Sequence, residues 1–487
     1  MTRVVSQNTM SNVRDQHGRI RPLATVLVAV VAVYIGEQVW LKKVQPHQRP
    51  ILPASTIPST DIAAPVFKDG AVNGTFDPAA QLVHVPASPY AGLLTEIDIM
   101  IHQGKLSEAH RKLDALAPEA LSDVTVRMNV ATLWNNVGVA QARAAGEMAP
   151  GTAAFKTAVT INPRNATAYM NLVLAYWESK NAALTTDMLE EAARLIPEDP
   201  MPHIILAERL IEKDDLSSAT AHLEQARMRS ADFPQSQAYL QSQIDSIERA
   251  RQSEQKFHSR DSSHFTVKYD GGEDYEVWTR VLEILEEAYR DIGRQLGRYP
   301  SKPLLVVLHT RETFQSATGG PAWSDGLYDP SLGRIKIPTR GALTDQAWLT
   351  RVLRHEYVHA VLDDWLQGRR LPQWLNEGLA MQLANDAPPD IPDFVRGDVR
   401  LIKLSVLEGP WVGLSSQQAV VAYLEGNSAT KYLVERYGIG PVRDLLDRVS
   451  KGEPFPAAFE DRIFISYEEF ERRWVDNLNL ALQSGRT

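Results

Sequence analysis

The sequence of 487 residues predicts a multidomain protein: helical repeats followed by an α+β domain, with one transmembrane helix near the N-terminus. Three observations predict this fold class. An apolar run lies near the N-terminus, a 34-residue spacing recurs mid-chain, and strand-like segments followed by two helical segments occupy the last part. The expected domains are a tail (1–22), a transmembrane helix (23–41), a linker (42–89), the repeats (90–255) and the α+β domain (256–487).

The apolar run begins at Leu23 and continues past Glu37 to Leu41, which is long enough to cross a bilayer. A cleaved signal peptide is the alternative, but the charged tail before the run is long and no A-x-A cleavage site precedes Lys42 and Lys43. Basic residues flank the two sides of the apolar run almost equally, so they do not fix its orientation. A short N-terminal tail inside the cell, with the bulk of the chain outside, is the default. We therefore expect a single-pass membrane protein whose bulk is periplasmic or otherwise outside the cytoplasm.

The segment that follows is expected to be an extended tether. It is interrupted by eight prolines and is poor in aromatic residues and charge, which suits a linker rather than a packed core. These prolines are Pro46, Pro50, Pro53, Pro58, Pro65, Pro78, Pro86 and Pro89. The whole chain contains no cysteine, so disulfides and thiolate metal ligands are excluded, and only histidine and carboxylate ligands remain plausible.

Residues 90–255 carry a helical pattern with an internal repeat. Two sets of residues recur at intervals of 34: Phe155, Leu189 and Leu223, and Ala158, Ala192 and Ala226. On this period the region resembles tetratricopeptide repeats, and the resemblance implies antiparallel helix pairs that stack into a groove for a peptide or protein partner. A plain helical bundle that braces the next domain is the alternative. If the helix pairs do stack in this way, we expect the repeats to be separable from that domain.

The last domain begins with strands and continues with helices. Residues 265–269 and 304–308 are expected to be strands separated by a long helix. Residues 326–328 and 334–337 indicate a hairpin around a turn-rich loop, and Pro338 cannot extend its second strand. Apolar residues at helical spacing then surround residues 347–362, and a further helix is expected around Glu377.

The most informative motif of the chain is His355-Glu356-Tyr357-Val358-His359. On a helix, residues four apart share one face, so His355 and His359 can direct two imidazole nitrogens at one metal ion. A catalytic zinc needs a third protein ligand and an open position for water, and Glu377 on the next helix can supply the ligand. Glu356 is then placed to act as the general base. The sequence therefore predicts a Zn²⁺ site.

Together with Trp374-Leu375-Asn376-Glu377-Gly378-Leu379-Ala380, this motif resembles the gluzincin metallopeptidases, particularly the bacterial peptidase MA-like families. The resemblance covers about Phe257 to Leu446 and implies a thermolysin-like zincin domain. It also implies zinc on His355, His359 and Glu377, with Glu356 activating water. In the resembled fold, an edge strand near the hairpin pairs with an extended peptide substrate.

Two features of that group are missing. Met381 stands where some gluzincins carry an aspartate that orients the first histidine, which leaves Asp363 and Asp364 as nearby candidates. The G-A-M-E-N signature of many aminopeptidases of this clan is also absent, so exopeptidase activity has no support. A donor for the oxyanion is still needed. Tyr423 is our first candidate and Tyr432 the second, although tyrosines on amphipathic helices more often belong to the core.

These observations predict a membrane-anchored zinc metallopeptidase that hydrolyses a protein or peptide substrate, with the helical repeats recruiting the substrate or a protein partner. One alternative is an envelope interaction scaffold whose peptidase-like domain is inactive or structural. Another is a zinc hydrolase of a non-peptide amide. The intact Glu356 favours an active enzyme. A formal net charge of -9 and the lack of a glycine-rich phosphate loop argue against nucleic acid as a partner.

Overall fold

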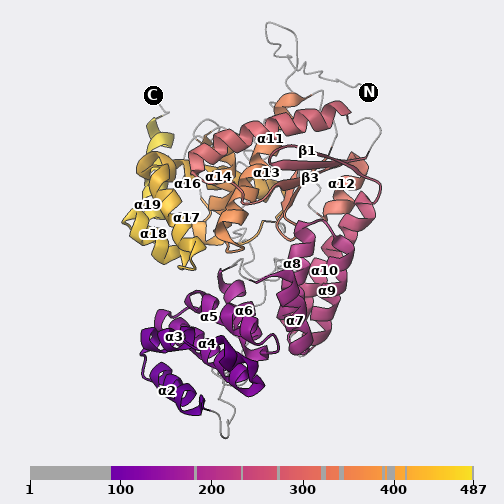
Figure 1. Cartoon of the computed structure of the whole chain (residues 1–487). Coiled ribbons are helices and arrows are strands. Elements are labelled where there is room, and N and C mark those ends of the chain that lie inside the picture. The colour runs from indigo at the N-terminus through magenta and orange to yellow at the C-terminus, as the bar shows by residue number, and fades with distance from the viewer. Residues whose placement is uncertain are drawn as a thin grey trace, which may run out of the picture. The chain divides into compact units, whose positions relative to one another are not determined.

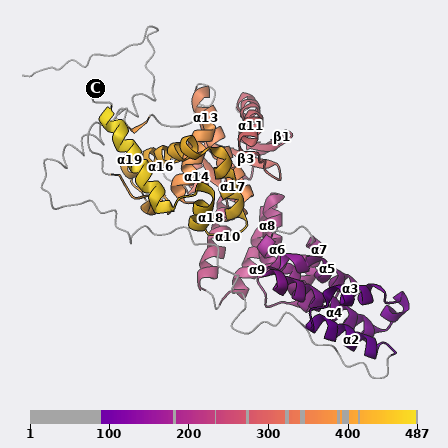
Figure 2. The same cartoon turned by 90° about the vertical axis from the view of Figure 1, so that its left-hand side faces the viewer.

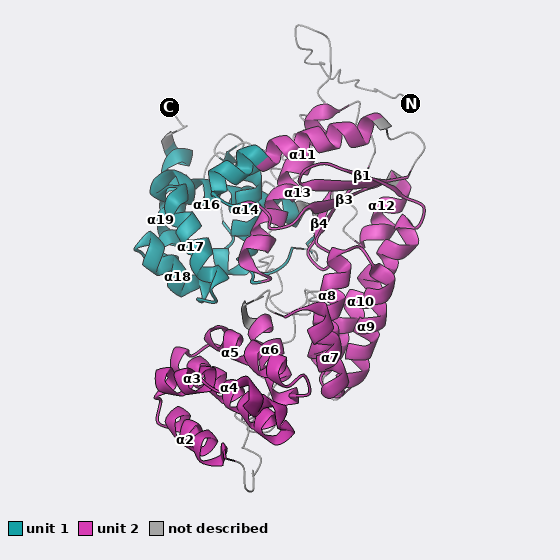
Figure 3. Ribbon diagram, viewed as in Figure 1, with its two compact units in different colours: residues 1–59, 290–298, 369–487 teal, residues 60–289, 299–368 magenta. Residues whose placement is uncertain are grey.

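The structure is a computed structural model, and it describes most of the chain beyond residue 88. The described residues are 89–179, 184–231, 234–270, 275–319, 325–338, 345–385, 390–391, 401–411 and 414–484. They fall into two compact units (Figure 3): described residues up to 289 together with 299–368 form one, and residues 290–298 with described residues from 369 onward form the other. The boundaries of these units differ from the predicted domain boundaries but do not test them, so the domain division stays a prediction.

The first part of the larger unit is a succession of helices (Figures 1 and 2). They are α2 (Ala91–His102), α3 (Leu106–Asp114), α4 (Val124–Ala145), α5 (Thr152–Ile161), α6 (Ala166–Ser179), α7 (Thr186–Leu195), α8 (Met201–Glu212), α9 (Leu216–Arg229) and α10 (Pro234–Glu254). Neighbours in the chain pack against each other, as α4 does on α5 and α8 on α9. Ala158, Ala192 and Ala226, which share the 34-residue spacing, are fully buried.

The same unit contains a five-stranded sheet in the order β1-β2-β3-β5-β4. The strands are β1 (His258–Asp261), β2 (Phe265–Tyr269), β3 (Leu304–His309), β4 (Leu327–Asp329) and β5 (Arg334–Pro338). Strands β2, β3 and β5 run parallel, whereas β1 and β4 pair antiparallel at the two edges. The turn between β4 and β5 uses Gly333, whose φ of 60° is a left-handed conformation that favours glycine.

The two faces of the sheet differ in chemistry. Ile335 and Ile337 of β5 are fully buried, and Ile337 lies on the side of α13 (Gln346–Leu366) because a Cβ added at Gly326 would meet both Ile337 and Val352 of that helix. Arg334 and Lys336 alternate with them and are also buried, on the face that bonds to α10. The long helix α11 (Tyr275–Leu296) connects β2 to β3, and α12 (Arg311–Thr318) contacts β3 and β5.

The smaller unit is helical in all its described elements. They are α14 (Gln373–Ala384), the 3₁₀ helix η4 (Leu404–Val406), α16 (Ser416–Tyr437), α17 (Ile439–Ser450), α18 (Phe455–Ile463) and α19 (Tyr467–Ser484). Its core contains stacked aromatic rings: Trp374 lies 6.3 Å from Tyr467 and 6.0 Å from Phe470 between ring centroids. Helix α14 packs closely on α16, which brings the residues around Glu377 into this core.

The predicted fold class is wrong in two respects. Helices make up 72% of the described residues, which contain one small sheet, and every element described beyond β5 is a helix, so a sequence of repeats followed by an α+β domain does not describe the fold. The reason is that apolar residues beyond position 345 recur at helical spacing and leave few segments that could extend the sheet. The fold class also included a transmembrane helix, but none of the described helices has the length and apolar character to span a bilayer. Residues 23–41, on which that prediction rests, lie outside the described residues, as do the tail and nearly all of the linker.

Candidate metal centre

Helix α13 carries both predicted histidine ligands. The helix begins after Asp345, whose carboxylate accepts a hydrogen bond from the backbone N–H of Trp348 at 2.9 Å and so caps the first turn. His355 and His359 are one turn apart, and their ring centroids are 4.9 Å apart. Both side chains are half-buried, whereas most of their neighbours on the helix are buried.

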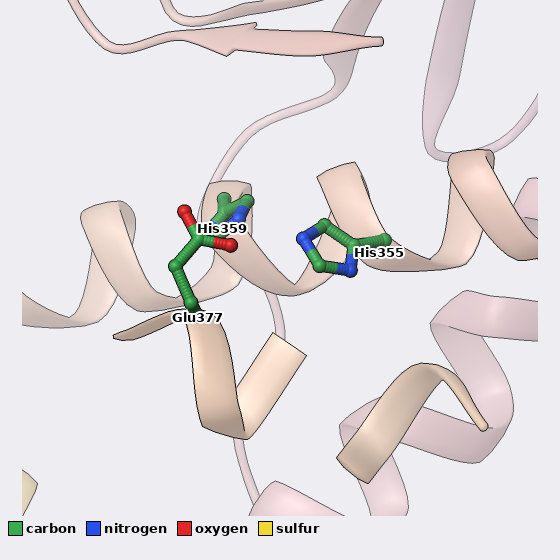
Figure 4. A group of neighbouring side chains, drawn as sticks. All are labelled: His355, His359 and Glu377. Carbon is green, nitrogen blue, oxygen red and sulfur yellow. The ribbon is translucent and has the colours of Figure 1, made fainter. Parts of the chain in front are cut away.

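Glu377 on α14 joins them. The ligand atoms of His355, His359 and Glu377 all lie within 4.8 Å of one another (Figure 4). Metal–ligand bonds of about 2.1 Å at a tetrahedral angle would separate the ligand atoms by about 3.4 Å, so small side-chain rotations would close the group around a zinc ion. Two imidazoles and one carboxylate are also the donor set of catalytic zinc sites. These residues therefore fit the predicted metal.

The carboxylate of Glu377 is held from within its own helix. Gln373 lies one turn earlier and donates from Nε2 to Oε1 of Glu377 at 2.9 Å. The first N–H groups of α14 are themselves bound, since Gln373 and Trp374 donate to the carbonyl oxygens of Glu408 and Leu407. Glu377 is only 7% exposed, and a buried carboxyl group is costly unless it is hydrogen-bonded or paired.

Glu356, the predicted general base, points toward the edge strand of the sheet. Its Oε2 accepts a hydrogen bond of 2.7 Å from the backbone N–H of Tyr328 on β4. The residue is 8% exposed. A hydrogen bond from a backbone amide fixes the carboxylate in one orientation. Glu356 is thus held by Tyr328, a residue of another element that sequence reasoning did not identify.

Gly326, just before β4, allows β4 and α13 to lie close together. A Cβ atom added at Gly326 would lie 2.5 Å from Cγ1 of Val352, 2.9 Å from Cδ1 of Ile337 and 3.3 Å from Cγ of Glu356. The two closest contacts are shorter than real Cβ contacts, so any side chain here would push β4 and α13 apart. The sequence contains this glycine before the hairpin, but only the packing shows why no side chain fits.

The two aspartates considered as partners of the histidines bond elsewhere. Asp363 accepts a hydrogen bond of 2.8 Å from the hydroxyl of Tyr328, and Asp364 accepts hydrogen bonds from the hydroxyl and the backbone N–H of Ser301. Burial raises the pKa of Asp363 above its ordinary value, against the effect of the Tyr328 hydrogen bond. Asp363 therefore anchors β4 to α13.

The two tyrosines predicted as oxyanion donors lie on α16. Tyr423 is half-buried and packs edge-to-face on Trp411, with 5.0 Å between ring centroids. Tyr432 lies 5.8 Å from the ring of Phe470 on α19, in the aromatic core of the smaller unit. The contact with Phe470 makes Tyr432 the less suitable of the two, and a catalytic role for Tyr423 stays a prediction.

Gln373 and Tyr328 were not identified from the sequence, and each donates a hydrogen bond to a predicted site residue. Gln373 could have been found, because it stands four residues before Glu377 on the same helix, where side chains meet. Tyr328 could not, because its amide reaches Glu356 only through the packing of β4 on α13.

No model of a known protein family matches this chain, and neither does any curated protein.

Proposed function

We propose that this protein is a zinc-dependent metallopeptidase of the gluzincin type that hydrolyses peptide bonds of a protein or peptide substrate. The observation that carries the proposal is the meeting of His355, His359 and Glu377, with ligand atoms within 4.8 Å of one another and with Glu356 next to His355 in the chain. The chain has no cysteine, so these ligands are also the kind that its composition allows.

In this proposal, His355, His359 and Glu377 hold zinc, which when bound supplies a Lewis acid that polarises the substrate carbonyl and acidifies water. Glu356 takes the proton of the attacking water and delivers it to the leaving amine nitrogen. The Tyr328 amide keeps the Glu356 carboxylate oriented for both transfers, and Gln373 keeps Glu377 oriented. Tyr423 is proposed, on sequence grounds alone, to donate to the developing oxyanion.

Two further parts of the proposal concern the substrate. Strand β4 is an edge strand, so an extended peptide could add to it through backbone hydrogen bonds with little side-chain selectivity. The Tyr328 N–H is engaged with Glu356, and the flanking residues of β4 direct their backbone groups toward β5, so such pairing would use the Tyr328 carbonyl oxygen. The helices from α2 to α10 are proposed to bind a protein partner or the substrate. The apolar run at residues 23–41 plays no part in the proposal.

The test combines metal analysis with a screen of labelled proteins as substrates. The purified parent should contain about one zinc per chain, and His355→Ala and Glu377→Ala should both lose it. The exposed His102 serves as the matched control, since His102→Ala should keep the metal. Glu356→Gln should keep zinc but lose hydrolysis by about three or more orders of magnitude, because the amide retains the shape and removes the base.

Retention of zinc by both ligand variants would refute the metal site. Activity of Glu356→Gln near that of the parent would refute the mechanism. If the parent binds zinc but cleaves no protein or peptide, the interaction scaffold is favoured. Cleavage of a small non-peptide amide alone would instead indicate the third function considered from the sequence.

A further inference from the structure

A cluster of buried charges joins α10 to the sheet. Its members are Asp214, Glu254, Lys268, Asp329, Arg334 and Lys336. The side chains of Arg334 and Lys336 are 0% and 1% exposed. Arg334 bonds to Glu254 at 2.9 Å, and Lys336 bonds to Asp329 at 2.8 Å. Because an unpaired buried charge is costly, each cation keeps its carboxylate partner in place.

Asp329 is the member of the cluster that lies on β4. Besides Lys336, it accepts hydrogen bonds from the hydroxyl of Ser331 at 2.5 Å and from the hydroxyl of Ser246 on α10 at 3.2 Å. Burial acts to raise the pKa of Asp329, but the charge and hydrogen bond of Lys336 outweigh it and hold the pKa below its ordinary value. Asp329 is therefore an ionised anchor between β4, β5 and α10.

The neighbouring residue on β4 faces the other way. Consecutive residues of a strand point to opposite faces of a sheet, so Tyr328 lies on the side of α13 while Asp329 lies on the side of α10. The Tyr328 hydroxyl donates to Asp363, and its backbone N–H donates to Glu356. A strand of three residues thus connects the buried charges on one face with the proposed general base on the other.

We propose that Asp329 is a positioning residue for Glu356, acting through the backbone of β4. This inference rests on the proposed function in one respect, the role of Glu356 as the general base. Strand β4 is short and pairs with one neighbour, so its ladder to β5 does little to hold it. The bonds of Asp329 hold β4 from the face opposite the Tyr328–Asp363 hydrogen bond, and their loss removes one of the two anchors that keep the Tyr328 amide on Glu356. A displacement of about 1 Å at a reacting group can lower a rate by about a hundredfold.

The first test is kinetic. Asp329→Asn keeps the shape of the side chain and removes its charge, so kcat should fall by about tenfold to a hundredfold. The comparison uses kcat at saturating substrate, because β4 is also the proposed substrate edge and its displacement changes KM as well. Zinc content should not change. The matched control is Asp214→Asn, the same substitution in the same cluster but away from β4. Asparagine also tolerates the left-handed backbone of Asp214, whose φ is 59°, and this control should keep kcat.

The second test does not depend on activity. Hydrogen exchange of the Tyr328 amide, measured on the full chain, should become faster in Asp329→Asn and in Glu356→Ala, since either change releases the amide from its acceptor. The same amide should exchange at the parent rate in Asp214→Asn. If Asp329→Asn does not fold, Ser246→Ala removes one donor to Asp329 and should give a smaller acceleration at Tyr328.

Unchanged exchange of the Tyr328 amide in the folded Asp329 or Ser246 variant overturns the inference. Equal acceleration in Asp214→Asn also overturns it, because the cluster would then act on the whole unit rather than on β4. A parent that hydrolyses no peptide bond refutes the proposed function but leaves the exchange result standing, so the two failures are distinguishable.

Discussion

At the scale of single residues, Gly378 determines how closely α14 can lie on α16. A Cβ atom at this position would be 2.0 Å from Oγ1 of Thr430, 2.5 Å from its Cβ and 2.8 Å from the carbonyl oxygen of Gly426. None of these atoms can move aside easily, since one is backbone and Thr430 is fully buried. The glycine after the metal ligand is therefore a requirement of helix packing.

We expect Gly378→Ala to lower the free energy of unfolding by about 1–3 kcal/mol or more, as overpacking does in a tight core. It should also weaken zinc binding, because Glu377 is the preceding residue. Urea denaturation and a zinc competition titration measure the two effects. The matched control is Gly440→Ala, on α17, where an added Cβ would meet nothing within 4 Å. If both variants unfold at the same urea concentration, the packing argument is wrong.

Glu425 is a second residue with a measurable consequence. It is buried in α16 and accepts a hydrogen bond of 2.9 Å from the backbone N–H of Ile402. Burial raises the pKa of Glu425 from its ordinary 4.5 to about 8, against the effect of that hydrogen bond. Between these values the folded chain holds a proton that the unfolded chain has lost. The free energy of unfolding should therefore decrease as the pH rises from about 4.5 to about 8.

Glu425→Gln should remove most of this dependence, because the amide is neutral at every pH and can still accept from Ile402. Chemical denaturation at pH 5 and pH 8 measures the free energy of unfolding, which should decrease more between the two pH values in the parent than in the variant. Glu435→Gln on the same helix is the control, since its side chain is 67% exposed and should leave the pH dependence unchanged. Identical slopes in parent and Glu425→Gln would contradict the assignment.

At the scale of elements, the first turn of α14 orients Glu377, the proposed third zinc ligand. Gln373 donates to Glu377, and the carbonyl oxygens of Leu407 and Glu408 accept from the first N–H groups of the helix. We expect Gln373→Ala to reduce zinc affinity by about tenfold to a hundredfold, which is typical when a partner of a ligand is removed. A competition titration with a zinc chelator measures it. Gln382→Ala, on the same helix but bonded to Asn427, should keep the parent affinity.

At the scale of the molecule, α10 belongs with the sheet rather than with a separable array. Arg334 is fully buried, and its guanidinium bonds to Glu254 at the end of α10 and to Asp214 just before α9. Removing one partner of a buried ion pair costs about 3–5 kcal/mol. This contact argues against the expectation from the sequence that the helical region can be deleted up to residue 255 without loss of the sheet.

We expect deletion of residues 91–255 to leave a chain that does not fold cooperatively, whereas deletion of 91–233 keeps α10 and gives a folded chain of reduced stability. Circular dichroism during thermal unfolding, with zinc content as a second measurement, compares the two. If the chain without residues 91–255 unfolds as cooperatively as the chain without residues 91–233, the buried charges on the sheet do not need α10.

The sequence by itself determined the features that depend on local spacing. The strands at residues 265–269 and 304–308 and the helix around His355 and His359 form where the pattern predicts them, because side-chain periodicity along one element sets its type and its face. Residues four apart on a helix share a face in any fold, so the common face of His355 and His359 on α13 was predictable from five residues.

The tertiary structure alone decided which faces meet. The alternating charges of β5 look like a solvent-facing strand in the sequence, yet Arg334 is buried because Glu254, 80 residues earlier, lies against it. The Tyr328 amide reaches Glu356, 28 residues later, only because β4 packs on α13. Such partners are set by the burial of whole faces and by the pairing that buried charges require, and neither leaves a periodic signal in one sequence.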